Sequence, residues 1–136
     1  MNVSERQLMV REFMRNMGWE VNDKPAQPPQ ELVDLFMFKL REEVGELGDA
    51  AGNTTDRVDF IELVDALRDV EYLLYGLELL FGVQEVSDDA FHEVHYSNMT
   101  KSMENGTVTK PTGFKKPRIH EVLKKAFPRM QMWFRS

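Results

Sequence analysis

Apolar residues recur at helical spacing along most of this chain, and short polar or proline-rich segments separate the stretches. Ser4 and Gln7 have the spacing of a capping box, in which two side chains close the start of a helix. The apolar positions that follow predict a first helix that stops at Gly18. Residues 19–29 hold three prolines, which cannot continue a helix, so we expect an extended connector there.

Two long helices are predicted next. The second helix spans about 30–51, and the Gly-Asn pair at 52–53 closes it. The sequence Thr-Thr-Asp at 54–56 offers N-cap side chains for a third helix. That helix is expected to reach about Phe81, with Gly82 just past its end.

The remaining third of the chain is less regular. Ser-Asp-Asp at 87–89 opens a fourth helix, which we expect to reach about Met103. Residues 104–117 are rich in turn formers and predict a loop or at most a short hairpin, and 118–127 predict a final short amphipathic helix. The predicted fold is therefore all-α, with four main helices forming a bundle and a basic C-terminal tail at about 104–136.

Acidic residues occupy the apolar side of the second helix. At about 100° per residue, Glu43 falls inside the apolar arc, Glu46 lies on its edge and Glu42 lies beside it. Taken alone, three acids at this spacing also occur on many solvated helices. A second cluster on the next helix is what makes them informative.

The third helix repeats this arrangement. Its apolar side carries the acids Glu62, Asp65 and Asp69. Glu71 and Glu78 fall on the opposite side, which we expect to face solvent. The chain thus has inward and outward acids on one helix.

Inward carboxylates need a partner, because burial and like charges both disfavour their ionised forms. Lys39 is the one obvious basic candidate on the inward face of the second helix. A divalent cation fits better, and an all-oxygen ligand set favours Mg²⁺ or Mn²⁺ over Zn²⁺. A di-iron site in a helical bundle requires Glu-x-x-His on two helices, whereas only Asp89 and His92 have comparable spacing here.

Length and composition narrow the class of protein. The 136 residues suit a single domain, and the absence of cysteine excludes disulfides and thiolate sites, which makes a cytoplasmic location the expectation. The N-terminal stretch lacks the pattern of a secretory signal. The most apolar run, 70–83, is too short to span a bilayer, so we expect no membrane segment.

Charge is distributed unevenly. Residues 1–100 carry 8 basic and 21 acidic side chains, a charge of −13, whereas 101–136 carry 9 basic and 2 acidic ones, a charge of +7. A basic tail of this kind permits an alternative function as a nucleic-acid-binding helical module. That alternative gives no reason for inward acids, so nucleic acid is not the expected partner.

These acids resemble a known pattern. Glu42, Glu43 and Glu46 are similar to the Glu-Glu-x-x-Glu motif of the all-α NTP pyrophosphatase superfamily, which includes MazG-like and phosphoribosyl-ATP pyrophosphohydrolase-like proteins. The stretch 61–76, with Asp69 as the final Asp, resembles the second acidic motif. Ala66 stands where many relatives carry Glu, and Asp65 and Glu62 are the available substitutes.

The resemblance covers about residues 8–117. The segment 91–101 is similar to the family's Glu-Val-His-x-Ser-Asn-Met-x-Lys, which implies that Asn98 and Lys101 contact the nucleotide. Lys101 could instead complement a helix C-terminus, and His95 is either a further ligand contact or a satisfied core histidine. Two departures from the pattern, Met14 for His and Phe36 for Arg, could alter substrate choice.

The resemblance also implies an activity. Such enzymes hydrolyse a nucleoside triphosphate to the monophosphate and pyrophosphate, in nucleotide-pool cleansing or remodelling. It implies two or more Mg²⁺ or Mn²⁺ ions and Glu42 or Glu43 as the base. The metal ligands it implies are Glu42, Glu43, Glu46, Asp65 and Asp69, with Glu62 as a further candidate.

The expected contacts of the leaving pyrophosphate are Lys101 and, in the basic tail, Lys110, Lys115 and Lys116. A homodimer or homotetramer is expected. The preferred base stays open between dGTP, dUTP and a broad range. A catalytically inactive member of the fold is a further alternative.

Overall fold

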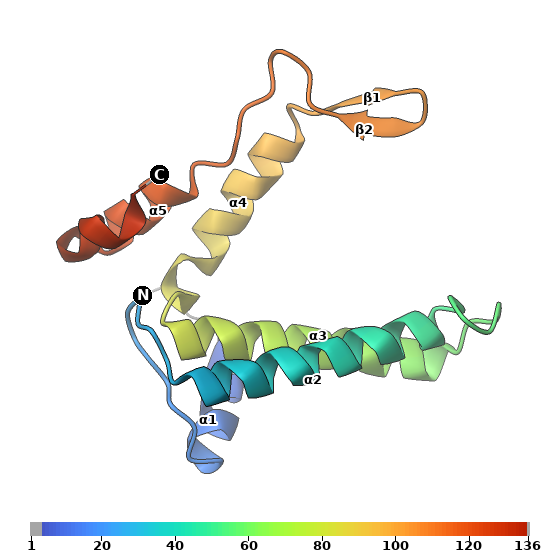
Figure 1. The fold of residues 1–136 in the computed structure, drawn as a ribbon, viewed down its shortest axis with the longest axis horizontal. Helices are drawn as coiled ribbons and strands as arrows, with labels where there is room; N and C mark the ends of the chain where they lie inside the picture. The colour runs from blue at the N-terminus through green and yellow to red at the C-terminus, as the bar shows by residue number, and fades with distance from the viewer. Residues whose placement is uncertain (1–3, 136) are drawn as a thin grey trace. The chain divides into compact units, whose positions relative to one another are not determined.

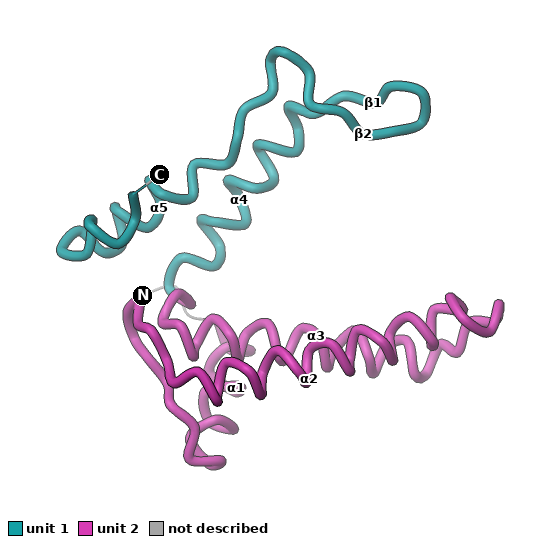
Figure 2. Tube along the Cα trace, in the orientation of Figure 1, with its two compact units in different colours: residues 1–2, 85–136 teal, residues 3–84 magenta. Residues whose placement is uncertain are grey.

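The computed structural model describes residues 4–135, in which helices are the main regular element and the two strands are short. The all-α prediction is confirmed. Within the described part, the chain forms two compact units, residues 4–84 and 85–135 (Figure 2). The prediction of a single domain stays a prediction. None of the described helices is long and apolar enough to cross a membrane.

The first helix, α1 (Glu5–Asn16), begins as predicted. The Ser4 hydroxyl oxygen accepts a hydrogen bond from the Gln7 amide at 3.2 Å, and the Gln7 side-chain oxygen accepts one from the Ser4 amide at 2.7 Å. Gln7 is buried, and its amide group also donates to the backbone oxygen of Gln84 at 3.3 Å. The Gln7 side chain therefore joins the start of α1 to the end of the 4–84 unit.

The helices α2 (Gln30–Ala50) and α3 (Phe60–Phe81) lie side by side as an antiparallel pair (Figure 1). The core of this unit consists of five buried side chains, Val10, Met14, Phe36, Leu79 and Leu80. It lies toward the end of the pair where α2 begins and α3 ends. The two departures from the family pattern, Met14 and Phe36, are therefore core residues.

Gly76 fixes how closely α2 and α3 approach. A Cβ atom at Gly76 would lie 2.8 Å from Cε2 of Phe36, which is too close for ordinary contact. Glu43 lies seven residues after Phe36, and Asp69 lies seven residues before Gly76, which is close to two helical turns on each helix. The contact in the core therefore sets the register that brings Glu43 opposite Asp69.

The start of α3 differs from the prediction. Its N-cap is Asp59, whose Oδ1 accepts from the Glu62 amide at 3.1 Å, whereas residues 54–56 lie in the preceding turn. Thr54 donates instead to Asp49 of α2 at 2.9 Å, and the Asp59 amide donates to the Ala50 oxygen at 2.9 Å. The Thr54 hydroxyl thus bonds to the end of α2 and does not cap α3. The N-cap of α3 is therefore a later residue, Asp59.

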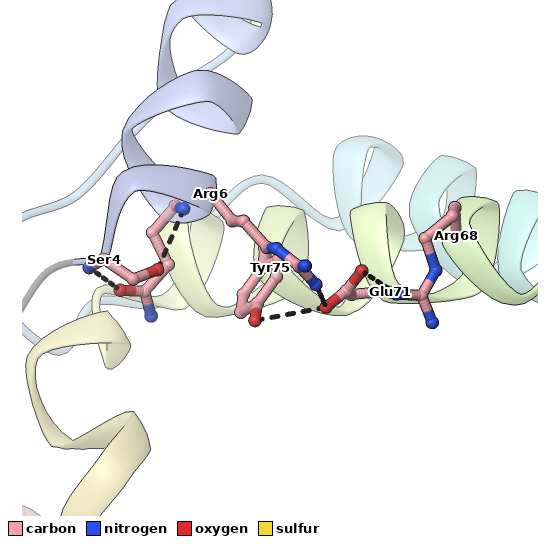
Figure 3. A network of polar contacts seen from close by, with 6 residues as sticks. Ser4, Arg6, Arg68, Glu71 and Tyr75 are labelled. Atoms are coloured by element: carbon pink, nitrogen blue, oxygen red, sulfur yellow. Dashed lines mark hydrogen bonds and ion pairs between the residues drawn. The ribbon is translucent and has the colours of Figure 1, made fainter.

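The side of α3 that carries Glu71 was expected to face solvent, but Glu71 and Glu78 are both half-buried. α1 covers part of it, and Figure 3 shows Arg6 of α1 reaching Glu71 at 2.6 Å. Arg68 pairs with the same carboxylate at 3.2 Å, and the Tyr75 hydroxyl donates to it at 3.4 Å (Figure 3). Glu78 is half-buried and accepts from the side chain of Gln7 at 3.5 Å. These contacts between α1 and α3 could not be predicted from the periodicity of α3 alone.

Residues 19–29 form the predicted extended connector, and they run along the end of α3. The Asn22 amide donates to the Leu79 oxygen at 2.9 Å, and the Ala26 amide donates to the Phe81 oxygen at 3.0 Å. Gly82 ends α3 in the left-handed region, with φ of 74°, as predicted for a helix C-terminus. A Cβ atom at Gly82 would overlap the backbone carbonyl of Lys24.

The 85–135 unit begins in η1 (Gln84–Val86), a 3₁₀ turn, and continues in α4 (Ser87–Asn98). The helix was predicted to reach about Met103 and to be capped by residues 87–89. Instead it ends at Asn98, and Val86 is its N-cap without a side-chain hydrogen bond. The Thr100 hydroxyl donates to the Ser97 oxygen at 2.7 Å and accepts from the Lys115 amide at 2.9 Å.

Residues 104–117 were expected to form a loop or at most a short hairpin, and a short hairpin that begins at Ser102 is present and explains the shorter helix. The strands β1 (Ser102–Glu104) and β2 (Thr107–Thr109) pair in antiparallel fashion, with Met103 opposite Val108. Asn105 and Gly106 connect them with φ of 51° and 77°. An Asn-Gly pair with two positive φ angles is the preferred two-residue hairpin turn, and its pairing removes residues 102–104 from the helix.

The chain ends in α5 (Ile119–Ala126) and η2 (Pro128–Phe134). The first agrees with the predicted helix over 118–127. The second was not predicted, because a proline at its start and short 3₁₀ geometry leave no 3.6-residue period to detect.

We expect Gly82→Ala to lower the free energy of unfolding by at least about 2 kcal/mol, because it adds backbone strain and a steric clash. Gly18→Ala is the matched control, since Gly18 has φ of 73° but open space around it. It should cost only about 1 kcal/mol. Urea denaturation followed by circular dichroism measures both, and equal losses would contradict the clash with Lys24.

Candidate active site

A pocket of about 400 Å³ opens between the three helices of the 4–84 unit. Four of its lining residues are acids, three from α2 and one from α3: Glu42, Glu43, Glu46 and Asp69. Lys39, Phe13, Tyr72 and Leu73 complete the lining. The packing of α2 on α3 thus brings four of the sequence-predicted acids, and Lys39, into one cavity.

Glu43 is the most enclosed of the three glutamates that line the pocket. It is half-buried, whereas Glu42 and Glu46 are exposed. Its Oε2 atom is buried and has no hydrogen-bond partner among residues 4–135. A buried carboxylate oxygen without a donor is unfavourable, so this atom is available to a proton or a cation.

The acids raise one another's proton affinity. Burial, followed by the neighbouring carboxylates of Glu46 and Asp69, raises the pKa of Glu43 to about 7. The pKa of Asp69 is also raised, first by burial and then by the charges of Asp65 and Glu46. The pocket therefore holds more negative charge than its surroundings neutralise.

Cationic side chains do not relieve this charge. Lys39 is exposed and makes no ion pair with any residue that the structure describes. The all-carboxylate donor set and the unpartnered Oε2 of Glu43 fit a hard divalent cation. Within residues 4–135, however, no three acidic or histidine side chains are arranged closely enough to enclose a metal ion. The side chains line one pocket without converging on one point.

The other two predicted acids of α3 are placed differently. Asp65 is exposed and lies outside the lining of the pocket, and it acts on Asp69 through its charge. Glu62 lines a separate cavity of about 740 Å³, which shares Glu46 with the first. Ala66 is buried, and by the helix register it lies opposite Glu46, where an acid would have faced Glu46 directly.

Three lining residues were not predicted as site residues. Phe13 and Tyr72 form an edge-to-face pair, with ring centroids 5.7 Å apart and planes at 74°, and Leu73 lies next to Tyr72. Tyr72 follows Asp69 by three residues, so the helical period places the two on neighbouring positions of one face. That spacing was the available signal, whereas nothing in the sequence pairs Phe13 with α3.

The remaining candidates belong to the 85–135 unit, and their predicted contacts with a nucleotide stay predictions. Asn98 is the last residue of α4 and is exposed, and Lys101 is half-buried. His95 is also exposed, so it is not a buried core histidine within the described chain.

Two of the tail lysines line a third cavity. Lys115 and Lys116 line a pocket of about 480 Å³ together with Arg118, whose Nε donates to Glu93 at 3.1 Å. Lys110 instead lies over the ring of Phe114, with its Nζ 5.3 Å from the ring centroid. The structure brings Lys115 and Lys116 together and places Lys110 elsewhere in the same unit.

Residues 10–98 match the model of the phosphoribosyl-ATP pyrophosphohydrolase family. The chain belongs to this family. The match covers nearly two thirds of the chain, from within α1 to the end of α4. A search of curated proteins gave no match.

Membership of the phosphoribosyl-ATP pyrophosphohydrolase family supports a pyrophosphohydrolase activity. The family match includes all four acids of the pocket, as well as His95 and Asn98. It ends before Lys101 and the tail. The acidic half of the predicted site therefore lies inside the family's matched segment, and the basic half lies largely outside it.

The raised pKa of Glu43 predicts a pH-dependent stability in the metal-free protein. Folding raises this pKa from 4.5 to about 7, so its contribution to stability is present below pH 4.5 and lost as the pH rises through 7. The Glu43→Gln variant has no carboxyl group at this position, so it does not lose this stability as the pH rises. We expect the variant to gain on the order of 1 kcal/mol relative to wild type between pH 5 and pH 8. Urea midpoints of both proteins with EDTA test this, and a difference independent of pH would contradict it.

Proposed function

We propose that this protein is a divalent-metal-dependent hydrolase that cleaves a nucleoside triphosphate, or a related nucleotide, to the monophosphate and pyrophosphate. The observation that carries the proposal is the buried, unpartnered Oε2 of Glu43 in a pocket lined by four carboxylates. A pocket of this charge repels a triphosphate by itself, so it suits that substrate only with cations between the two. The family match supports the reaction type.

Mg²⁺ or Mn²⁺ is the proposed cofactor, with two or more ions per site. Glu43, Glu46 and Asp69 would hold the ions, with Glu42 and Asp65 in support and Glu62 as a further candidate from the adjoining cavity. When bound, such ions neutralise phosphate charge and acidify the attacking water. Carboxylates are oxygen ligands, which these hard cations prefer.

Glu42 or Glu43 is the proposed general base. A carboxyl whose pKa is raised to about 7, as for Glu43, can accept or release a proton near neutral pH. Glu42 lines the same pocket and is exposed, so it can exchange a proton with solvent. The base must reach the water that attacks the α phosphorus.

Several nucleotides are candidate substrates. dGTP, dUTP and a wide range of triphosphates are the candidates, with a role in nucleotide-pool cleansing or remodelling in the cytoplasm. Phosphoribosyl-ATP, which gives the matched family its name, is a second candidate. We propose that Asn98 and Lys101 contact the nucleotide, that Lys110, Lys115 and Lys116 hold the pyrophosphate, and that His95 is a further ligand contact.

Association of identical chains is part of the proposal. α3 exposes apolar side chains at helical intervals, Phe60, Val64, Leu67 and Leu74. An unpaired apolar stripe on a long helix favours burial against a partner. A homodimer or homotetramer would cover this stripe and complete the bundle.

Glu43→Gln tests the enzyme proposal. We expect it to lower Mg²⁺-dependent pyrophosphate release at least about 100-fold, because it removes a charged ligand and a candidate base, while the helical content stays unchanged. The assay uses a panel of the eight common NTPs and dNTPs with phosphoribosyl-ATP. Glu31→Gln is the matched control, since Glu31 is exposed on the same helix and lies outside the pocket.

Full activity of Glu43→Gln would remove Glu43 from the site. Wild-type protein that neither binds Mn²⁺ nor releases pyrophosphate would favour an inactive member of the fold. Salt-sensitive binding of DNA, lost when residues 110–136 are deleted, would favour the nucleic-acid-binding alternative.

The mass of the protein in solution tests the proposed association of identical chains. Sedimentation equilibrium of wild type should give a mass two or four times the 15.9 kDa of one chain. Val64→Glu, which places a charge in the apolar stripe, is expected to shift the mass toward that of one chain. Val108→Glu in β2 is the matched control, because Val64 and Val108 are 59% and 58% exposed. A 15.9 kDa wild type, or equal effects of both variants, would contradict this interface.

A further inference from the structure

Two aromatic rings form the apolar wall of the acidic pocket. Phe13 and Tyr72 line it, and each is 40% exposed although their rings contact one another edge to face. A contact that served only to build the core would bury them, as it buries Phe36. Their exposed surfaces are therefore available to a ligand in the pocket.

The position of Phe13 is fixed from behind. Its ring packs edge to face on Trp19, with centroids 5.8 Å apart, and Trp19 packs on Phe36 at 5.3 Å. Phe36 is 2% exposed and belongs to the core. This series of rings holds Phe13 in place before any ligand arrives, which lowers the entropic cost of binding on it.

Tyr72 is fixed by its helix and has an unused polar group. It lies three residues after Asp69 on α3, beside the acids. Its hydroxyl forms no hydrogen bond with any other residue of the described chain, whereas the Tyr75 hydroxyl donates to Glu71. The fold therefore uses the polar end of Tyr75, whereas packing on Phe13 is the contact that holds the ring of Tyr72.

We propose that Phe13 and Tyr72 form an aromatic platform on which the base of the substrate stacks. This inference rests on the proposed function, because the acids and their cations would take the phosphates. The base is the uncharged, planar part of such a substrate, and aromatic rings bind it through its π-face. A volume of about 400 Å³ lies within the range of small-molecule sites.

The platform predicts a specific kinetic pattern. Tyr72→Leu should raise KM for nucleoside triphosphates about tenfold, the size of one lost stacking contact, and change kcat less than about twofold. Tyr72→Phe keeps the ring and should keep KM. For ribose 5-triphosphate, which lacks a base, wild type and Tyr72→Leu should have the same KM.

Phe13→Leu provides a second variant, expected to raise KM in the same direction. Phe38→Leu is the control, because Phe38 is exposed on α2 and lies outside the lining of the pocket. Circular dichroism and thermal melting establish that each variant is folded. Should both platform variants fail to fold, wild type alone decides, since it should have a KM about tenfold lower for dGTP than for ribose 5-triphosphate.

Failure of the aromatic platform can be distinguished from failure of the proposed hydrolase activity. If wild type cleaves triphosphates and Tyr72→Leu leaves KM unchanged, the platform is wrong and the proposed function stands. An equal rise of KM for ribose 5-triphosphate would also overturn the platform, because the ring would then contact sugar or phosphate. If wild type neither binds nor cleaves any triphosphate, both proposals fall.

Discussion

The close packing of α2 against α3 at Phe36 and Gly76 is the contact on which the rest of the 4–84 unit depends. Glycine lets the aromatic ring approach the backbone of α3, and the ring in turn belongs to the core. Because both helices are regular, this contact fixes their register two turns away, where Glu43 meets Asp69. The position of the acidic pocket is thus a consequence of core packing. A shift of α2 along α3 would separate Glu43 from Asp69.

The pocket is held in a state that is electrostatically unfavourable by itself. Four carboxylates line it, one buried oxygen has no hydrogen-bond partner in the described part of the chain, and two of the acids have raised pKa values. By contrast Glu71, on the other side of α3, is paired with Arg6 and Arg68. Glu71 is therefore paired in a way that stabilises the fold, whereas Glu43 on α2 keeps a buried oxygen with no hydrogen-bond partner among residues 4–135. Binding sites commonly reduce stability in this way, because groups arranged for a ligand are poorly arranged for one another.

Much of the fold could be predicted from local signals. The capping box at Ser4, the left-handed Gly82 and the hairpin turn at Asn105 are each determined by a few neighbouring residues. Predictions failed where several local signals competed. Thr54 had the chemistry of an N-cap but closes α2 instead, and the Asn-Gly turn shortens α4 by pairing residues that would have extended it.

The sequence by itself determined the helices and which acids share a face with apolar residues, because a 3.6-residue period is a property of one chain segment. It also carried the family pattern on α2. Only the tertiary structure decided which of those acids meet: Glu42, Glu43, Glu46 and Asp69 line one pocket, while Asp65 and Glu62 lie outside it. The tertiary structure likewise placed Phe13 and Tyr72 beside the four acids of the pocket. Contacts between helices depend on register and packing, which are set by residues elsewhere in the core.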